Sequence, residues 1–367
     1  MKGQWIGKYN GDVEGKIMIN IDEVEDHYEA VAYVNPNKKE FPISVAYLST
    51  LDKRPVQNAV AYINPVDPKT GHQCKWEDIK DLYPEDVSHS EQSNVSFKLE
   101  GSKLHLDSTS NIGAKLSSTL TKPAEDNKSK IVGEEISWSE FKSRVSQYLN
   151  NKYLYRGQKE TWRLRTSFHR GDRYRISKFI DTDVKQLHKK LSSITPHYFD
   201  LNIPEQNGSF INLIQHHGYP TPLLDWTYSP YVSAFFAFRD WPIGCSANKF
   251  SRIYVFNNSE WQKNYPQNQN IDPPHPHLSV MDFIAINNPR LVPQQAVTTV
   301  TNIDDIEAYV LEREKESSKE YLKAFDISAK ERDIAMIDLR FMGITAGSMF
   351  PSIAGICEDH KERNFDK

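Results

Sequence analysis

The first third of the chain alternates apolar and polar side chains with a period of two residues. In Gly15–Ile21 an isoleucine stands at every second position. This period is typical of a strand that is buried on one face. Further strands are expected at residues 28–34, 43–48, 60–63, 95–99 and 103–106. Residues 1–120 are therefore predicted to form an antiparallel β-barrel or sandwich, a β-rich accessory domain without catalytic residues.

A short repeat within this region supports the same prediction. The sequence VAYVNP at residues 31–36 returns as VAYINP at residues 60–65. Two copies are too few for a solenoid, which needs at least three. We interpret them as equivalent strands of one small β-structure, each ended by an Asn-Pro turn.

The pattern changes after a polar stretch at residues 121–135, which contains Pro and Gly and has the composition of a linker. An amphipathic helix is predicted to begin at Ser137. Further helices are expected at residues 182–192, 210–216, 230–239, 304–322 and 328–341, with strands at 153–155, 252–257 and 296–300. Because these elements do not alternate as βαβ units, residues 136–367 are predicted to form an α+β domain.

Composition excludes several classes of protein. The chain has 45 Lys and Arg against 49 Asp and Glu, a net charge of −4, so it is not a generally basic nucleic-acid coat. Its three cysteines are far apart, and no Cys/His cluster has metal-ligand spacing, so neither a disulfide framework nor a metal site is expected. No apolar run is long enough to span a bilayer, and the N-terminus does not resemble a signal peptide. A cytoplasmic protein without a membrane partner is expected.

The first motif that could carry chemistry is Tyr155-Arg156-Gly157-Gln158. An Arg at the end of a short strand, followed by Gly, places a guanidinium where backbone can approach a ligand. Residues 152–175 carry eight Lys and Arg against two acidic residues. On charge alone this stretch is either a solvated basic face or a phosphate-binding surface.

The second motif is QHHGYPTPLLDWTYSP, residues 215–230. Asp225, Thr227 and Ser229 alternate along an extended segment, so their side chains can share one face. Ser229 also suits the N-cap of the following helix, which opens with Pro230. His216 and its neighbour are interpreted as a turn and core pair, because adjacent side chains do not converge on an ion.

The third motif, residues 288–298, holds Arg290 and the amide of Gln294 ahead of a strand. Neutral amides bind hydroxyls or bases, but they cannot act as acid or base.

Together the three motifs resemble the FRG domain family, which is named for a Phe/Tyr-Arg-Gly motif. Residues 155–158 match that motif, and residues 215–221 with 224–227 match its central signature, which typically reads QHYGLPTRLLDWT. Arg290 and Gln294 match a later R-x-x-x-Q element, and residues 342–344 and 349–353 match a closing segment. The resemblance covers residues 136–360 and implies the family's α+β fold.

The order of the motifs is also similar to that of the ADP-ribosyltransferase fold. This similarity implies NAD as cofactor, with Arg156 on its pyrophosphate, Thr227 on the nicotinamide ribose and Gln294 where transferases usually have a carboxylate. Asp225 is the further catalytic candidate, although its carboxylate could simply hold Arg156. The cofactor-binding residues implied are Tyr155, Arg156, Gly157, Gln158, His216, Trp226, Ser229 and Arg290, with Tyr155 or Trp226 stacking on rings.

Three functions stay open at this point. The first is an NAD-using enzyme, either ADP-ribosyltransferase-like or an NAD glycohydrolase, whose acceptor is a protein or a nucleic acid. The second is a non-catalytic sensor that binds a nucleotide in the FRG domain and a protein partner through the β domain. The third is an RNA- or DNA-processing protein that uses residues 152–175 to track phosphates.

Overall fold

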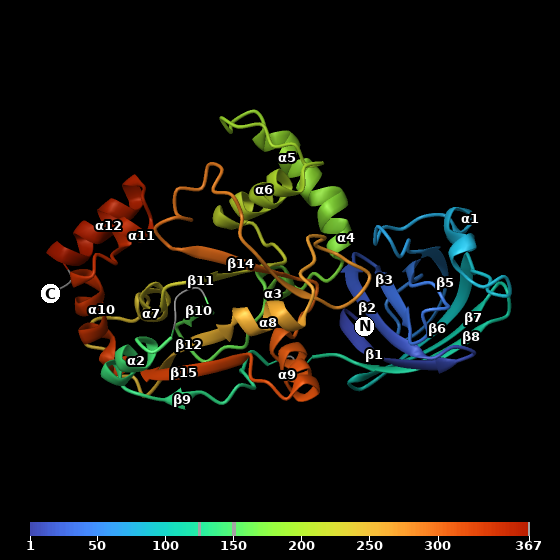
Figure 1. Ribbon diagram of the computed structural model, residues 1–367, viewed down its shortest axis with the longest axis horizontal. Coiled ribbons are helices and arrows are strands. Elements are labelled where there is room, and N and C mark those ends of the chain that lie inside the picture. The colour runs from blue at the N-terminus through green and yellow to red at the C-terminus, as the bar shows by residue number, and fades with distance from the viewer. Residues whose placement is uncertain (124–125, 149–151, 366–367) are drawn as a thin grey trace.

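The structure is a computed structural model that describes residues 1–123, 126–148 and 152–365 (Figure 1). Its N-terminal part is a closed barrel of eight antiparallel strands in chain order. The strands are β1 (Gly3–Gly11), β2 (Gly15–Val24), β3 (His27–Pro36), β4 (Ser44–Ser49), β5 (Val56–Pro65), β6 (Gln92–Glu100), β7 (Lys103–Ser110) and β8 (Lys115–Thr121). The short helix α1 (Trp76–Ile79) lies between β5 and β6. The prediction of an N-terminal β-barrel is confirmed.

The repeated sequences are equivalent strands, as expected: β3 and β5 end at Pro36 and Pro65. Two strands were not predicted, and they are the pair that closes the barrel, β1 and β8. Their apolar pattern is weak, because β8 is rich in Ser and Thr and β1 contains Gly7. A Cβ at Gly7 would lie 2.9 Å from the side chain of Leu120 on β8, so the small residue permits the close approach of the two strands.

The rest of the chain is built on a seven-stranded sheet. Its strands, in spatial order, are β13 (Leu278–Met281), β14 (Ala296–Thr301), β11 (Leu223–Thr227), β10 (Tyr153–Gln158), β12 (Phe250–Asn257), β15 (Leu322–Ser328) and β9 (Glu134–Glu135). Neighbouring strands are antiparallel, except that β9 runs parallel to β15. The predicted α+β class is confirmed.

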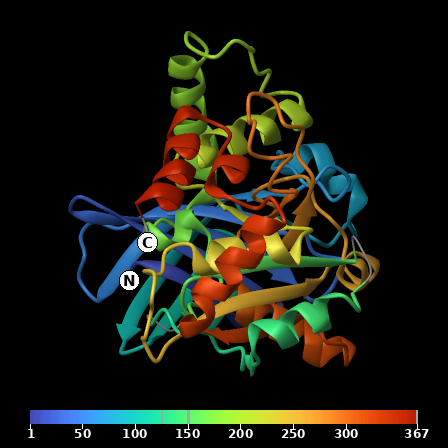
Figure 2. The same cartoon turned by 90° about the vertical axis from the view of Figure 1, so that its left-hand side faces the viewer.

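Helices cover both faces of this sheet. They are α2 (Trp138–Val145), α3 (Ser167–Arg170), α4 (Ile176–Lys178), α5 (Lys185–Leu191), α6 (Pro204–His216), α7 (Pro230–Phe238), α8 (Asn258–Asn264), α9 (Ile306–Ser317), α10 (Arg332–Phe341), α11 (Ala346–Met349) and α12 (Ile353–Asn364). One core contains residues of α2, α7 and α10 packed on β10, β12 and β15. A second core joins α8 and α9 to the opposite face. Figure 2 shows α10, α11 and α12 at the end of the molecule away from the barrel.

The structure corrects the predicted helix at residues 304–322. The helix α9 ends at Ser317, and Ser318 has a left-handed φ of +54°. The strand β15 then begins at Leu322, where no strand was predicted. Four consecutive residues of β15 are buried, so the strand lacks the alternation that reveals a strand with one exposed face. The helix predicted at 210–216 begins earlier, at Pro204.

Barrel and sheet are joined through buried polar contacts. Gln4 of β1 donates to the carbonyl of Asn302 at 2.6 Å and accepts from the amide of Asp304 at 2.9 Å. Asp22 of β2 accepts from the amide of Tyr174 at 2.6 Å. The predicted boundaries, with a linker at 121–135, stay a prediction, and residues 124 and 125 lie outside the described residues. In the described part of the chain, no helix has the length and apolar character needed to cross a membrane.

Candidate functional site

A cleft opens where the central sheet splits. The described residues of β10 and β11 form one pair, Tyr155 with Thr227. Arg156 with Trp226 and then Gly157 with Asp225 would be the next partners in an antiparallel ladder, but neither pair forms, so the strands diverge. Side chains from both strands line a cleft of about 630 Å³ in this fork. That volume is in the range of small-molecule sites in proteins.

Arg156 bridges the split between the strands. Its Nη1 donates to the main-chain oxygen of Asp225 at 2.6 Å, where the backbone ladder has stopped. Among the described residues its Nε is buried and makes no hydrogen bond. Removal from bulk water lowers the pKa of Arg156 to about 10, and the charge of Asp225 opposes that shift, so the guanidinium is protonated at neutral pH.

The central signature forms a chain of hydrogen bonds that ends at Asp225. Thr221 donates its hydroxyl to the amide oxygen of Gln215, and the Gln215 Nε2 donates to Asp225 Oδ1. The carboxylate is exposed to the open cleft, yet the surrounding walls raise its pKa by desolvation. Arg156, Gln215 and Arg170 act in the opposite direction and favour the charged form.

Thr227 and Gln294 both line the cleft and are hydrogen-bonded to each other. The Thr227 hydroxyl donates to the main-chain oxygen of Gln294 at 2.7 Å, and it accepts from the amide of Ser229. The Gln294 Nε2 donates to the carbonyl of Met349 at 2.9 Å, which ties this loop to α11. Both side chains line the cleft, but much of their hydrogen-bonding capacity is used within the protein.

Positive charge dominates the lining of the cleft. Among the described residues that line it, two carboxylates, Asp225 and Asp240, face six cationic side chains: Arg156, Lys159, Arg163, Arg165, Arg170 and Arg290. Arg165 is paired with Asp304 at 2.5 Å, and Arg163 Nη1 lies 3.6 Å from Asp305. Arg170 donates to a main-chain oxygen, and Arg290 lies over the ring of Phe350. The cleft therefore offers a positive potential to a ligand.

The model of the FRG domain matches residues 151–242. The chain carries an FRG domain. The match runs from β10 to just beyond α7 and so contains Arg156, the hydrogen-bonded signature and Thr227. Arg290 and Gln294 approach the same cleft from beyond the matched residues. Neither the curated proteins nor the solved structures gave a match to the chain.

The cleft brings most of the predicted site residues together. All four catalytic candidates line the cleft, as do Tyr155, Gly157, Gln158, His216, Trp226 and Arg290. The cleft lining given by the described residues does not include Ser229. Ser229 is buried and accepts a hydrogen bond from the amide of Val232 as the N-cap of α7. This cap role was one of the two interpretations open for Ser229, and it accounts for the side chain.

The predicted stacking role of Tyr155 and Trp226 is not supported. Their side chains are 4% and 3% exposed and belong to the cores on opposite faces of the sheet. The Trp226 indole also donates to Thr299 Oγ1 at 3.0 Å. Among the described residues of the cleft lining, Trp162 is the most exposed aromatic side chain, at 44%, and Phe236 and Phe350 are half-buried.

The structure gives Gly157 a different role from the one expected. We expected it to let a ligand approach the backbone, but a Cβ here would lie 1.8 Å from the carbonyl oxygen of Ser233 in α7. The glycine of the Tyr-Arg-Gly motif therefore lets α7 pack directly on β10.

Sequence reasoning missed part of the lining. Asn212 of α6 stands three and four residues before Gln215 and His216, so the three side chains share one helix face, a spacing that could have identified it. Burial lowers the pKa of His216 to about 4, with Arg290 adding to the effect, so its imidazole is neutral. Asn288, which donates to Asn212 at 2.8 Å, had no such local signal.

Proposed function

We propose that the cleft of the FRG domain binds an anionic nucleotide, with NAD as the first candidate. One observation carries the proposal: among the described residues of the cleft lining, Lys159, Arg156, Arg170 and Arg290 converge where β10 and β11 separate, in addition to Arg163 and Arg165, which are paired with Asp305 and Asp304. A phosphate or pyrophosphate is the ligand group that such a set of guanidinium groups suits best, because their paired N–H groups match its oxygens.

Arg156 is the residue we assign to the phosphates. One of its N–H groups is used by the Asp225 carbonyl and Nε is buried, so three donors on the two terminal nitrogens remain for a ligand. It lies at the base of the fork, held by the strand on which it stands. A preorganised donor of this kind loses little entropy when a ligand binds.

The remaining cleft groups suit the other parts of a nucleotide. Trp162, Phe236 and Phe350 offer rings for a base or a nicotinamide. The amides of Gln158, Asn212 and Gln294 can bind ribose hydroxyls or base edges.

Calorimetric titration of the full chain with NAD, ADP-ribose and adenosine tests this proposal. NAD and ADP-ribose should bind, and adenosine should bind at least about tenfold more weakly, because it lacks the charge-assisted bonds to phosphate. The affinity for ADP-ribose should fall as salt is added. Equal affinity for adenosine, or no binding by any of the three, would contradict a phosphate-centred site.

A second candidate function is cleavage of NAD, and it rests on Asp225. In this reaction the bond between nicotinamide and C1′ of the ribose breaks, nicotinamide leaves with the electron pair, and a water oxygen bonds to C1′ and releases a proton. The exposed carboxylate of Asp225 could stabilise the positive charge that develops on the ribose. Gln294 is a neutral amide, which leaves that role to Asp225.

Release of nicotinamide by wild type and Asp225→Asn separates this function from binding alone. If Asp225 acts on the reaction, wild type releases nicotinamide and the variant loses the activity while it still binds ADP-ribose. If wild type binds NAD without releasing nicotinamide, the non-catalytic sensor is the better account.

The nucleic-acid alternative draws less support. Arg173 is paired with Asp183, and Arg175 with Glu29 of the barrel. Tyr174 is 6% exposed, so its ring is not offered to a base. The basic stretch at 152–175 is thus divided between the cleft and structural ion pairs.

A further inference from the structure

The two ends of the barrel interior are filled differently. At the end where β1 begins, large side chains close the interior: Trp5, Leu104 and Leu120 have no exposed surface. The Trp5 indole donates to the carbonyl of Met1 at 2.8 Å, and the N-terminal amine lies 3.2 Å from the Tyr28 hydroxyl. This end is the base of a cup.

Toward the other end, small side chains line part of the wall. Ala32 and Ala46 are cross-strand partners on β3 and β4, Ala61 pairs with Ser93, and Val95 pairs with Ser108. These residues leave space that larger residues fill at the base. The result is a hollow of about 220 Å³ with a mostly apolar wall, to which Ile17, Ile63 and Leu116 also contribute.

Polar groups at the mouth are neutral or already paired. Ser93 and Ser108 hydrogen-bond to each other at 2.5 Å. His89 lies 3.1 Å from the Ser44 hydroxyl through Nε2 and stacks on Trp76, and burial lowers its pKa to about 4. The lining carries one cationic residue, Lys115, and one acidic residue, Asp12, among the residues described. This wall gives a charged ligand no matched set of partners, so an uncharged ligand suits it better.

From this cup we infer that the barrel is a second binding site, for a small, uncharged and predominantly apolar molecule. An eight-stranded barrel is just wide enough to be filled by side chains or to hold one small ligand. An apolar cavity of about 150 Å³ binds benzene, so a hollow of about 220 Å³ suits a molecule somewhat larger, such as a fused bicyclic compound.

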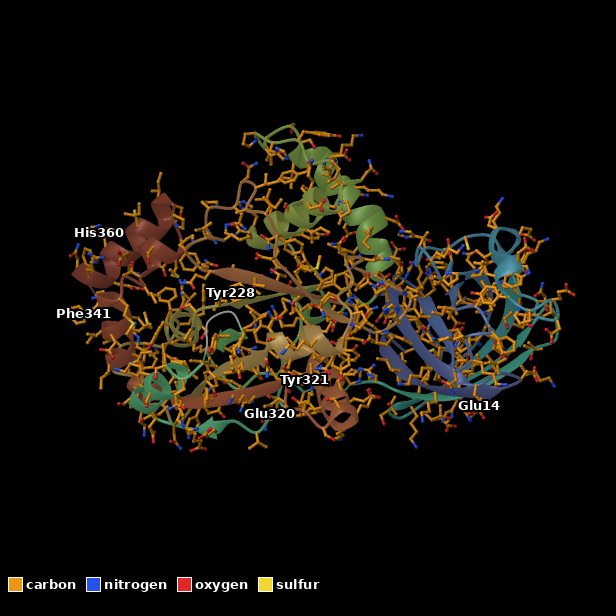
Figure 3. All side chains as sticks on the ribbon, in the orientation of Figure 1. Glu14, Tyr228, Glu320, Tyr321, Phe341 and His360 are labelled. Carbon is orange, nitrogen blue, oxygen red and sulfur yellow. The ribbon has the colours of Figure 1, made fainter. Side chains whose placement is uncertain are left out.

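The position of the mouth fits a ligand that enters from solvent. The hairpin between β1 and β2, which contributes Asp12 and Val13 to the rim, lies away from the FRG domain, as the place of Glu14 in Figure 3 shows. Ile112, in the loop between β7 and β8, is 50% exposed at the same rim. The closed base makes the cup a dead end, which suits a small molecule better than a peptide that must pass through.

The test titrates the full chain with 2-naphthol and naphthalene, monitored by the ligand's fluorescence and by the thermal midpoint of unfolding. Both probes should bind saturably at one site per chain and raise the midpoint, because a ligand that binds the folded state stabilises it. The matched variants are Ala61→Phe and Val60→Phe. Ala61 faces the cup, and its neighbour Val60 is 43% exposed on the outside of the same strand.

Ala61→Phe should weaken binding by about tenfold or more, since its ring occupies the space of the ligand, and Val60→Phe should bind as wild type does. Ala46→Leu, a smaller change on the neighbouring strand β4, gives the same test if the phenylalanine is not accommodated in the fold. Absence of saturable binding to wild type, or unchanged binding in a folded Ala61→Phe or Ala46→Leu protein, would overturn the inference. Because ADP-ribose titration reports on the cleft, these results stand apart from those on the proposed function.

Discussion

Arg156 and Gly157 are adjacent in the sequence but have different roles in the structure. Arg156 donates a hydrogen bond across the split in the sheet to the carbonyl of Asp225. At Gly157, the space that a side chain would fill is taken by the backbone of α7. The positions of Arg156, Asp225, Thr227 and Gln294 in one cleft could be expected from the order of the motifs. The packing role of Gly157 could not be expected from the sequence, because its contact is with Ser233, which is distant in sequence.

Replacing Gly157 with Ala should destabilise the FRG domain strongly. The added Cβ would lie 1.8 Å from the Ser233 carbonyl, which is backbone and cannot rotate away. We expect a loss of about 3 kcal/mol or more of unfolding free energy, the upper range for overpacking, measured by urea denaturation. Gly171→Ala is the matched control, since its Cβ would come no closer than 3.3 Å to a neighbour. A Gly157→Ala protein as stable as wild type would contradict the packing role.

At the scale of elements, helices and strands with a regular apolar pattern could be predicted from the sequence. Strands without such a pattern, and the pairing between distant strands, could not. Residues 15–21 and 28–34 were predicted as strands and lie in β2 and β3, although Ile17–Asp22 and Ala30–Tyr33 are buried in succession because both faces of these strands are covered. Strand β15 was missed because its sequence, LKAFDIS, has apolar side chains at both odd and even positions, so no alternation marks it as a strand. The split between β10 and β11 depends on pairing between segments about 70 residues apart, which no local pattern reports.

Ser229 belongs to helix α7 and should act only on stability. Its hydroxyl caps the helix by accepting from the Val232 amide at 3.2 Å, and Ser229 does not line the cleft described above. Ser229→Ala should cost about 1 kcal/mol of unfolding free energy, the usual effect of losing an N-cap. Denaturation and ADP-ribose titration on one sample check this. A loss of nucleotide affinity without a loss of stability would return Ser229 to the binding site.

Across the whole molecule, the barrel and the α+β part of the chain meet at a buried carboxyl group. The Tyr33 hydroxyl of β3 donates to Asp272 Oδ2 at 2.5 Å, and Asn35 donates to the carbonyl of Pro274 at 2.9 Å. Desolvation raises the pKa of Asp272 from 3.8 to about 7, against the hydrogen bond from Tyr33. Contacts of this kind join residues more than 200 positions apart, so the sequence alone gave no indication of them.

The junction should therefore make stability depend on pH. Because the folded protein holds the Asp272 proton more tightly than the unfolded chain, this group favours folding below pH 3.8, and that contribution is lost as pH rises through about 7. Asp272→Asn cannot ionise and should be more stable than wild type at about pH 8, with the difference shrinking toward about pH 5. The urea midpoints of unfolding of both proteins at the two pH values measure this difference in stability. A difference that does not change with pH would contradict the raised pKa.

The central claim is that Arg156 anchors a phosphate-bearing nucleotide in the cleft. Its most direct test is calorimetric titration of ADP-ribose into wild type, Arg156→Ala and Arg173→Ala, with the unfolding free energy of each protein measured on the same sample. Arg173 belongs to the same basic stretch but is paired with Asp183 and does not line the cleft described above.

The account predicts that Arg156→Ala stays folded and loses ~1.5–3 kcal/mol of binding energy, the value of a charge-assisted hydrogen bond, or roughly 10- to 150-fold in affinity. Arg173→Ala should bind as wild type does. A folded Arg156→Ala protein with unchanged affinity would contradict the claim.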